Sequence, residues 1–294
     1  MTPPFAARLA DGRLHLQHGP IDLIVEAEGP FAEVEAAYDQ AEARFPDILP
    51  SLAEELPLLR APIGAVSPRG PVAQRMRWAC LPFSDQAFVT PMAAVAGAVA
   101  DELLAAMTRA RRLAKAYVNN GGDVAFFLTP GTQIGVGLLA DLDTAEPAGR
   151  VDLDAGQRGR GLATSGRGGR SFSLGIADAV TVLAETAAQA DAAATLIANA
   201  VDVDDPAVTR RPAASLDPDS DLGERPAVTA LGPLSDAAID RALAAGFERA
   251  AQFQTQGLIL GAVLSLRGRR RALGPLQAPG PAVVLPSADR SVPA

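Results

Sequence analysis

The stretch Ala116-Tyr-Val-Asn-Asn-Gly-Gly-Asp-Val-Ala-Phe-Phe-Leu128 has two apolar runs with a polar, glycine-containing segment between them. The runs predict two antiparallel strands joined by a turn. An ordinary hairpin needs only two turn residues, whereas this segment is longer. Glycine lets backbone approach a ligand closely, and asparagine amides can bind the polar edges of a ring or a ribose. Two interpretations stay open, a hairpin with a long turn or a pocket floor made by Asn119, Asn120, Gly121, Gly122 and Asp123.

On both sides of this stretch, short predicted strands alternate with longer predicted helices. Residues 92–107 are mostly small and apolar and follow Thr90-Pro91, which predicts a buried helix packed closely against a neighbour. Apolar spacing predicts further helices at 30–45, 187–200 and 235–254, and strands at 133–140, 178–184 and 257–267. This mixture is typical of an α+β fold with antiparallel sheets packed against helices.

Composition limits the classes of function. The chain has 294 residues, 48% of them hydrophobic, which suffices for a sizeable core. We expect one domain over residues 1–268 and a disordered tail over 269–294, where prolines, small residues and arginines gather. A formal net charge of -8 argues against nucleic acid as a partner. The single cysteine excludes an internal disulfide framework.

The amino-terminal sequence has no signal-peptide pattern. The first ten residues, MTPPFAARLA, lack a basic start followed by an apolar core, and no uncharged apolar run reaches the length of a membrane span. We therefore expect a cytoplasmic protein with no membrane partner. The oligomeric state is not predicted by any pattern in the sequence.

Four motifs in order resemble the ApbE superfamily. They are Ala94-Val-Ala-Gly97, Asn120-Gly-Gly-Asp123, the Thr-Ser-Gly loop with the Val-Thr-Val strand after it, and Ala190-Asp-Ala-Ala-Ala-Thr195. The likeness runs from about residue 91 to 200. The sequence of this segment is similar to that of an uncharacterised bacterial and archaeal branch of the superfamily. Each motif alone is weak, whereas the four in order are fairly specific.

The resemblance implies an α+β fold of the T-fold type that binds a flavin nucleotide, FAD or FMN, between two halves. It implies Mg²⁺ held by the carbonyl of Ala96 and by Asp191 and Thr195, with Thr164, Ser165 and Gly166 at the nucleotide. It also implies transfer of FMN from FAD to a threonine of a flavoprotein partner. Independently, Asp191 and Thr195 are four residues apart on one helix face and offer the hard oxygen ligands that magnesium accepts. A solvated Asp on a helix surface is the alternative.

This chain departs from the superfamily's motifs in two places that bear on the transfer reaction. The superfamily has a His-x-x-Asp-Pro-x-Thr-Gly segment after the Thr-Ser-Gly loop, where this chain has residues 167–177 without histidine or proline. The lysine of the superfamily's Gly-Ile-Ala-Lys-Gly motif is also absent, because Gly97 or Ala98 stands in its place. We expect ligand binding with slow or absent FMN transfer, and we leave open whether the protein is an enzyme.

Two further features suggest other chemistry. Glycines alternate with Arg158, Arg160, Arg167 and Arg170, and such a loop can direct guanidinium groups at a phosphate. Cys80 has Arg75 and Arg77 nearby, which could lower a thiol pKa, although buried cysteines usually act as small apolar residues. A sulfur-transfer or persulfide-carrying protein, or a non-catalytic module that binds a nucleotide-like ligand, are therefore the alternative functions.

Overall fold

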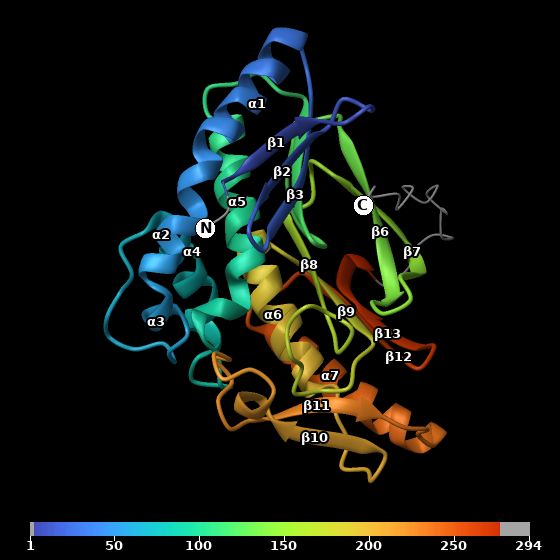
Figure 1. The fold of residues 1–294 in the computed structure, drawn as a ribbon. Coiled ribbons are helices and arrows are strands. Elements are labelled where there is room, and N and C mark those ends of the chain that lie inside the picture. The colour runs from blue at the N-terminus through green and yellow to red at the C-terminus, as the bar shows by residue number, and fades with distance from the viewer. Residues whose placement is uncertain (1–2, 277–294) are drawn as a thin grey trace.

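The computed structural model describes residues 3–276, and its main element is a nine-stranded antiparallel sheet (Figure 1). In spatial order its strands are β1 (Phe5–Arg8), β2 (Leu14–His18), β3 (Ile21–Glu28), β4 (Lys115–Asn120), β5 (Asp123–Leu128), β8 (Gly161–Ser165), β9 (Ala179–Ala184), β12 (Gly261–Leu266) and β13 (Arg269–Leu273). Neighbouring strands far apart in sequence, such as β5 and β8, bring the motif-bearing segments to the middle of the sheet.

Helices cover one face of this sheet (Figure 1). They are α1 (Phe31–Arg44), α2 (Ile48–Glu54), α3 (Leu56–Leu59), α4 (Pro71–Cys80), α5 (Val95–Thr108), α6 (Ala187–Ala200) and α7 (Asp236–Thr255). Short 3-10 turns connect them, namely η1 (Phe45–Asp47), η2 (Leu81–Phe83) and η3 (Pro91–Ala94), with η4 (Ala213–Ser215) and η5 (Gly274–Leu276) later in the chain. Helix α5 packs on β4 and β5, and α6 packs on β8 and β9.

A two-stranded sheet covers part of the opposite face. It consists of β6 (Gln133–Asp141) and β7 (Glu146–Asp154), and its apolar side chains form a second core with Phe126 and Leu162. Side chains along β5 point alternately to the two faces of the sheet. Phe126 faces this second core, and Ala125 faces the helices. The middle of the large sheet is therefore buried on both sides, which explains why every residue of β9 is buried.

The third sheet pairs β10 (Val208–Pro212) with β11 (Pro226–Leu231). The loop between them reaches back to the segment before α5, where the hydroxyl of Thr90 donates a hydrogen bond to Asp221. Thr90 therefore does not cap the following helix through its side chain. The predicted helix over 92–107 is divided into η3 and α5, so that the backbone amides of Ala96 and Gly97 lie in the first turn of α5.

The architecture confirms the predicted α+β class with antiparallel sheets and helices. The boundary predicted for a disordered tail is wrong, because residues 269–273 form β13, paired along its length with β12. Residues 277–294 of that predicted tail lie outside the described residues. The single-domain assignment stays a prediction.

Within residues 3–276, one helical segment has the length and composition of a membrane span. Residues Pro91–Thr108, which combine η3 and α5, have a mean hydropathy of 1.3. Several of their side chains, including Val99 and Leu103, are fully buried between the sheet and the other helices. We interpret this segment as a core helix, and the cytoplasmic location stays a prediction.

Candidate functional site

The turn between β4 and β5 is shorter than the sequence suggests. Asn120 pairs with Asp123 in the strand register, so only Gly121 and Gly122 form the turn. Both glycines have positive φ angles, 64° and 115°, which other residues rarely adopt. The side-chain oxygen Oδ1 of Asn119 accepts a hydrogen bond from the Gly122 amide at 2.9 Å. The turn is thus a two-residue hairpin, and the expectation of a long turn is wrong.

Asn120 connects this hairpin to the start of α5. Its Nδ2 donates a hydrogen bond to the carbonyl oxygen of Ala96 at 3.1 Å. Its Oδ1 is buried and has no hydrogen-bond partner among the described residues. A buried acceptor without a donor costs free energy, so this oxygen is a suitable contact for a ligand group or a cation.

Asp123 is the first residue of β5 and is also buried. Its Oδ1 accepts a hydrogen bond from the backbone amide of Thr164 at 3.2 Å, which joins the hairpin to the Thr-Ser-Gly loop. Burial raises the pKa of this carboxyl group, while the Thr164 amide and the positive charge of Arg170 oppose the rise. The charged form of Asp123 is therefore poorly stabilised by the protein alone.

Asp191 lies on α6 and contacts the same segment as Asn120. Its Oδ2 accepts a hydrogen bond from the Gly97 amide at 3.0 Å, and the Ala96 amide also donates to this carboxylate. Burial and the negative charge of Asp123 raise the pKa of Asp191 well above its ordinary value. The carboxylate is held against the first turn of α5, which rules out the alternative of a solvated Asp on a helix surface.

A second carboxylate forms the reverse connection between the same two helices. Asp101 of α5 accepts hydrogen bonds from the amides of Ala187 and Ala188 at 3.0 and 2.9 Å, which are the first two residues of α6. The hydroxyl of Thr186 accepts from the Gln189 amide and completes the cap. Each helix therefore supplies a carboxylate that caps the amino terminus of the other.

Two glycines permit this close packing. A Cβ atom on Gly97 would collide with the carbonyl of Ala187, and a Cβ atom on Gly161 would collide with the backbone of Thr186 and Ala187. The alanine-rich sequence of α6 serves the same purpose, because small side chains let the backbones of helices and strands approach. The Ala-Val-Ala-Gly motif is therefore explained by packing as well as by any ligand.

The remaining predicted residues lie on α6 and at the end of β8. Thr195 follows Asp191 by one turn of α6 and is half-buried. The hydroxyl of Thr164 lies 2.9 Å from that of Thr181 on β9, so its side chain is engaged within the sheet. Ser165 is half-buried at the end of β8, and Gly166 accepts a hydrogen bond from the Gly169 amide at 3.0 Å.

The four arginines predicted to bind an anion differ in their contacts. Arg158 pairs with Glu185. Arg160 donates to backbone carbonyls of residues 155, 157 and 159. Arg167 pairs with Asp143 at 3.1 Å and with Asp178 at 3.0 Å. Arg170 reaches the β4–β5 turn and donates a hydrogen bond to the carbonyl of Pro20 at 3.1 Å.

These donors fit a hard divalent cation. No cluster of three or more His, Cys, Asp or Glu side chains suitable for a metal occurs within residues 3–276, so a metal here would also need carbonyl, amide or hydroxyl oxygens. The Ala96 carbonyl, Asp191 and the hydroxyl of Thr195 offer such oxygens, and the unpartnered Asn120 oxygen and Asp123 add further acceptors for a ligand. Oxygen ligands are what Mg²⁺ prefers, and a cation would offset the repulsion between Asp123 and Asp191.

Cys80 does not have the properties of a reactive thiol. It is fully buried at the end of α4, and burial, with the negative charges of Asp191 and Asp221, raises its pKa well above the ordinary value. Arg75 pairs with Glu102, and Arg77 donates to the carbonyl of Gly64. The arginines expected to activate the thiol are thus engaged elsewhere.

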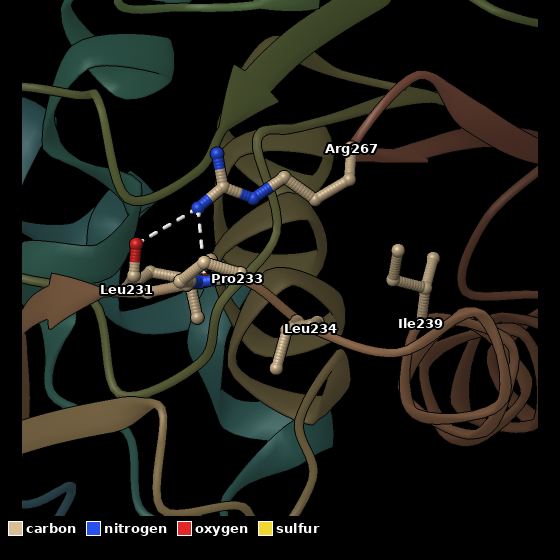
Figure 2. Close-up of a pocket in the computed structure, with 6 residues that line it drawn as sticks. Leu231, Pro233, Leu234, Ile239 and Arg267 are labelled. Carbon is tan, nitrogen blue, oxygen red and sulfur yellow. Dashed lines mark hydrogen bonds between the residues drawn. The ribbon is translucent and has the colours of Figure 1, made fainter.

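Two cavities lie away from the predicted residues. One of about 390 Å³ is lined by Leu231, Gly232, Pro233, Leu234, Ile239 and Arg267 (Figure 2). Its only charged lining residue, Arg267, donates to the carbonyls of Leu231 and Gly232 at 2.8 and 3.3 Å. The other, of about 480 Å³, lies at the base of the β6–β7 hairpin, where residues 130–133 and 154–156 line it. Neither cavity includes a residue of the four motifs.

Comparison with curated proteins finds archaeal relatives that match part of their length. A UPF0280 protein of Methanopyrus kandleri is 40% identical over 148 residues, which cover 50% of this chain and 56% of the relative. A UPF0280 protein of Methanothrix thermoacetophila is 37% identical over 137 residues, with 46% and 54% covered. The chain spans about half the length of the curated relatives it matches.

Two solved structures are similar at low sequence identity. The flavinyl transferase ApbE of Pseudomonas stutzeri, in its apo form, is 13% identical with a TM-score of 0.48, covering 92% of this chain and 93% of that one. The ApbE protein of Thermotoga maritima is 13% identical with a TM-score of 0.39, covering 91% and 96%.

A protein-family model shows which family this chain belongs to. The model is described as AbpE bacteria, and it matches residues 6–272, which include all four motifs and every strand of the large sheet except the first residue of β1 and the last of β13. The resemblance to the ApbE superfamily is confirmed, and the chain belongs to this bacterial AbpE family.

Proposed function

We propose that this protein binds a flavin nucleotide, or a related anionic ligand, together with Mg²⁺ at the β4–β5 turn and the first turn of α5. The observation that carries the proposal is the pairing of buried Asp123 with Asp191, which is half-buried against the first turn of α5, beside the unpartnered Oδ1 of Asn120. The negative charge of Asp123 raises the pKa of Asp191, and a bound cation would replace this repulsion by attraction. Family membership favours a flavin nucleotide as the ligand.

The proposed metal ligands are the Ala96 carbonyl, Asp191 and Thr195. Asn120 orients the Ala96 carbonyl through its Nδ2 hydrogen bond, and Asp191 is fixed by the amides of α5. Bound Mg²⁺ would neutralise phosphate charge and orient the ligand. The proposed nucleotide contacts are then Asn119, Asn120, Gly121, Gly122, Asp123, Thr164, Ser165 and Gly166.

Calorimetric titration tests the binding proposal. Wild-type protein is titrated with FMN and with FAD, in the presence of Mg²⁺ and in the presence of EDTA. We expect binding that requires Mg²⁺ and that Asp191→Asn abolishes, whereas Asp152→Asn, which removes a charge from an exposed ion pair on β7, leaves it unchanged. Equal binding by wild type and Asp191→Asn, with or without Mg²⁺, would show that Asp191 is only a structural cap.

We infer that FMN transfer to a flavoprotein acceptor is slow or absent. Transfer requires the acceptor hydroxyl to be activated or placed against the phosphate, and this chain lacks both the His-containing segment and the Lys of the superfamily. Asp123 and Asp178 are nearby acids, but Asp178 is engaged with Arg167 and the Arg267 amide. Incubation with FAD, Mg²⁺ and an acceptor protein, scored by AMP release and acceptor mass, tests this; rapid flavinylation would make the protein a working transferase.

The sulfur-transfer alternative has less support. Cys80 is buried and its thiol has a raised pKa, so neither access nor thiolate formation favours a persulfide carrier. A non-catalytic ligand-binding module is supported by the same residues as the main proposal. Tight Mg²⁺-dependent binding without turnover would distinguish that module from an enzyme.

A further inference from the structure

Arg170 has a position that the four motifs do not explain. It belongs to the loop between β8 and β9, and its guanidinium lies directly over the β4–β5 turn, where a Cβ atom on Gly121 would collide with its Nη2. The other terminal nitrogen, Nη1, donates to the Pro20 carbonyl at 3.1 Å. Its positive charge also acts on Asp123. The loop thus brings a cation to the edge of the carboxylate pair.

The other arginines of the glycine-rich segment 156–170 do not supply that charge. Arg167 is bound between Asp143 and Asp178, Arg160 donates to backbone carbonyls, and Arg158 pairs with Glu185. Arg170 has no carboxylate hydrogen-bonded to it within the described part of the chain, and its side chain remains exposed. It is therefore available to a ligand.

The helix termini that commonly bind phosphate are already engaged. The first amides of α6 donate to Asp101, and those of α5 donate to Asp191. A phosphate at this site would thus find no free helix amino terminus. The buried Oδ1 of Asn120 is an acceptor and would repel a phosphate oxygen, so an anionic group also needs a donor of its own.

We propose that Arg170 binds the phosphate of the ligand that Mg²⁺ holds at Asp191. This inference rests on the proposed function and adds the residue that would distinguish a phosphorylated flavin from riboflavin. Its guanidinium can donate two parallel hydrogen bonds to phosphate oxygens, which a lysine cannot do in the same geometry. Gly121 is required because any side chain there would displace the guanidinium.

The test compares FMN with riboflavin, both in the presence of Mg²⁺, by fluorescence titration. Arg170→Gln should weaken FMN binding by about tenfold or more and leave riboflavin binding unchanged. Arg158→Gln removes the same charge from an exposed ion pair and should change FMN affinity by less than about twofold. Gly121→Ala should reproduce the effect of Arg170→Gln without removing a charge.

Unchanged FMN affinity in Arg170→Gln, or an equal loss for FMN and riboflavin, would overturn the assignment of Arg170. If riboflavin binds too weakly to measure, the difference between Arg170→Gln and Arg158→Gln on FMN decides. If wild-type protein binds no flavin, the proposed function fails, and inorganic pyrophosphate with Mg²⁺ then tests Arg170 alone. Thermal stabilisation by pyrophosphate in wild type but not in Arg170→Gln would support the anion site, and no stabilisation in either would contradict it.

Discussion

Asp101 and Asp191 perform the same structural task at the two ends of the α5–α6 contact, but their surroundings differ. Each accepts backbone hydrogen bonds at the start of the other helix. Asp101 has the positive charge of Arg75 nearby, whereas Asp191 has the negative charges of Asp123 and Asp101. The hydrogen bonds of the two carboxylates are thus alike, and the charges around them are what differ.

The most damaging change should remove both caps at once. Gly97→Val and Gly161→Val each place a branched side chain against the backbone at the start of α6. The helices would have to separate, so we expect each variant to lose more than about 3 kcal/mol of unfolding free energy. Urea denaturation measures this, with Gly137→Val as the control, because a Cβ atom at Gly137 meets no atom within 4 Å. Similar losses in all three variants would contradict the packing argument.

Charge-removing substitutions should distinguish Asp101 from Asp191 by their effects on stability. Asp101→Asn replaces one of two acceptor oxygens by a donor that faces a backbone amide, so we expect a loss of about 2 kcal/mol. Asp191→Asn keeps an acceptor for Gly97 and relieves the repulsion by Asp123, so its loss should be smaller.

The response to Mg²⁺ should show the opposite order. Thermal unfolding with and without Mg²⁺ should show stabilisation of wild type and Asp101→Asn, and none of Asp191→Asn. Loss of the Mg²⁺ response in Asp101→Asn alone would reverse the assignment of the two residues.

The pH dependence of stability should originate at Asp123 and Asp191 rather than at surface groups. Burial raises the pKa of Asp123 from 3.8 to about 7, so the folded state binds a proton that the unfolded state has already released. Stability without Mg²⁺ should therefore be greatest below the unfolded value and fall as the pH rises through this window, by up to about 1.4 kcal/mol per pH unit. Asp123→Asn should flatten the profile measured by urea denaturation. An unchanged profile would show that burial does not raise the pKa of Asp123.

The smallest effect should come from the turn itself. Gly122 has a φ of 115° but no atom within 4 Å of a built Cβ, so Gly122→Ala costs only backbone strain. We expect a loss of about 1 kcal/mol in unfolding free energy and little change in Mg²⁺ response. Gly121→Ala should cost similar stability but also displace Arg170. A larger binding defect in Gly122→Ala would place the ligand against Gly122.

The sequence predicted elements better than it predicted contacts. Strand β5 follows from the alternating apolar residues 124–128, and α6 from its alanine-rich run, because local patterns determine both. Strand β13 was missed because three consecutive arginines, residues 269–271, resemble a solvated tail. Their side chains instead reach partners elsewhere, as Arg269 pairs with Asp236 and Asp240.

The candidate site was located by motifs, but its chemistry was not. Asn120-Gly-Gly-Asp123 and Asp191 were recognisable, whereas their electrostatic coupling depends on the pairing of β5 with β8 and on the packing of α5 against α6. Asp101 was missed entirely, because a capping residue that lies 86 positions from the helix start it caps leaves no local signal. The sequence does not distinguish Arg170 from the other arginines of its segment, because only the structure shows which of them are engaged in ion pairs or hydrogen bonds.

The reciprocal caps also bear on how the protein folds and opens. The two sets of hydrogen bonds connect residues 86 and 94 positions apart, so these caps can form only when the two helices have packed against each other. Contacts of such long sequence separation slow folding, because a large loop must close before they form. Once formed, they tie the two helix ends into one cooperative unit. Amide hydrogens of residues 96–97 and 187–188 should then exchange with solvent together, in a single opening event.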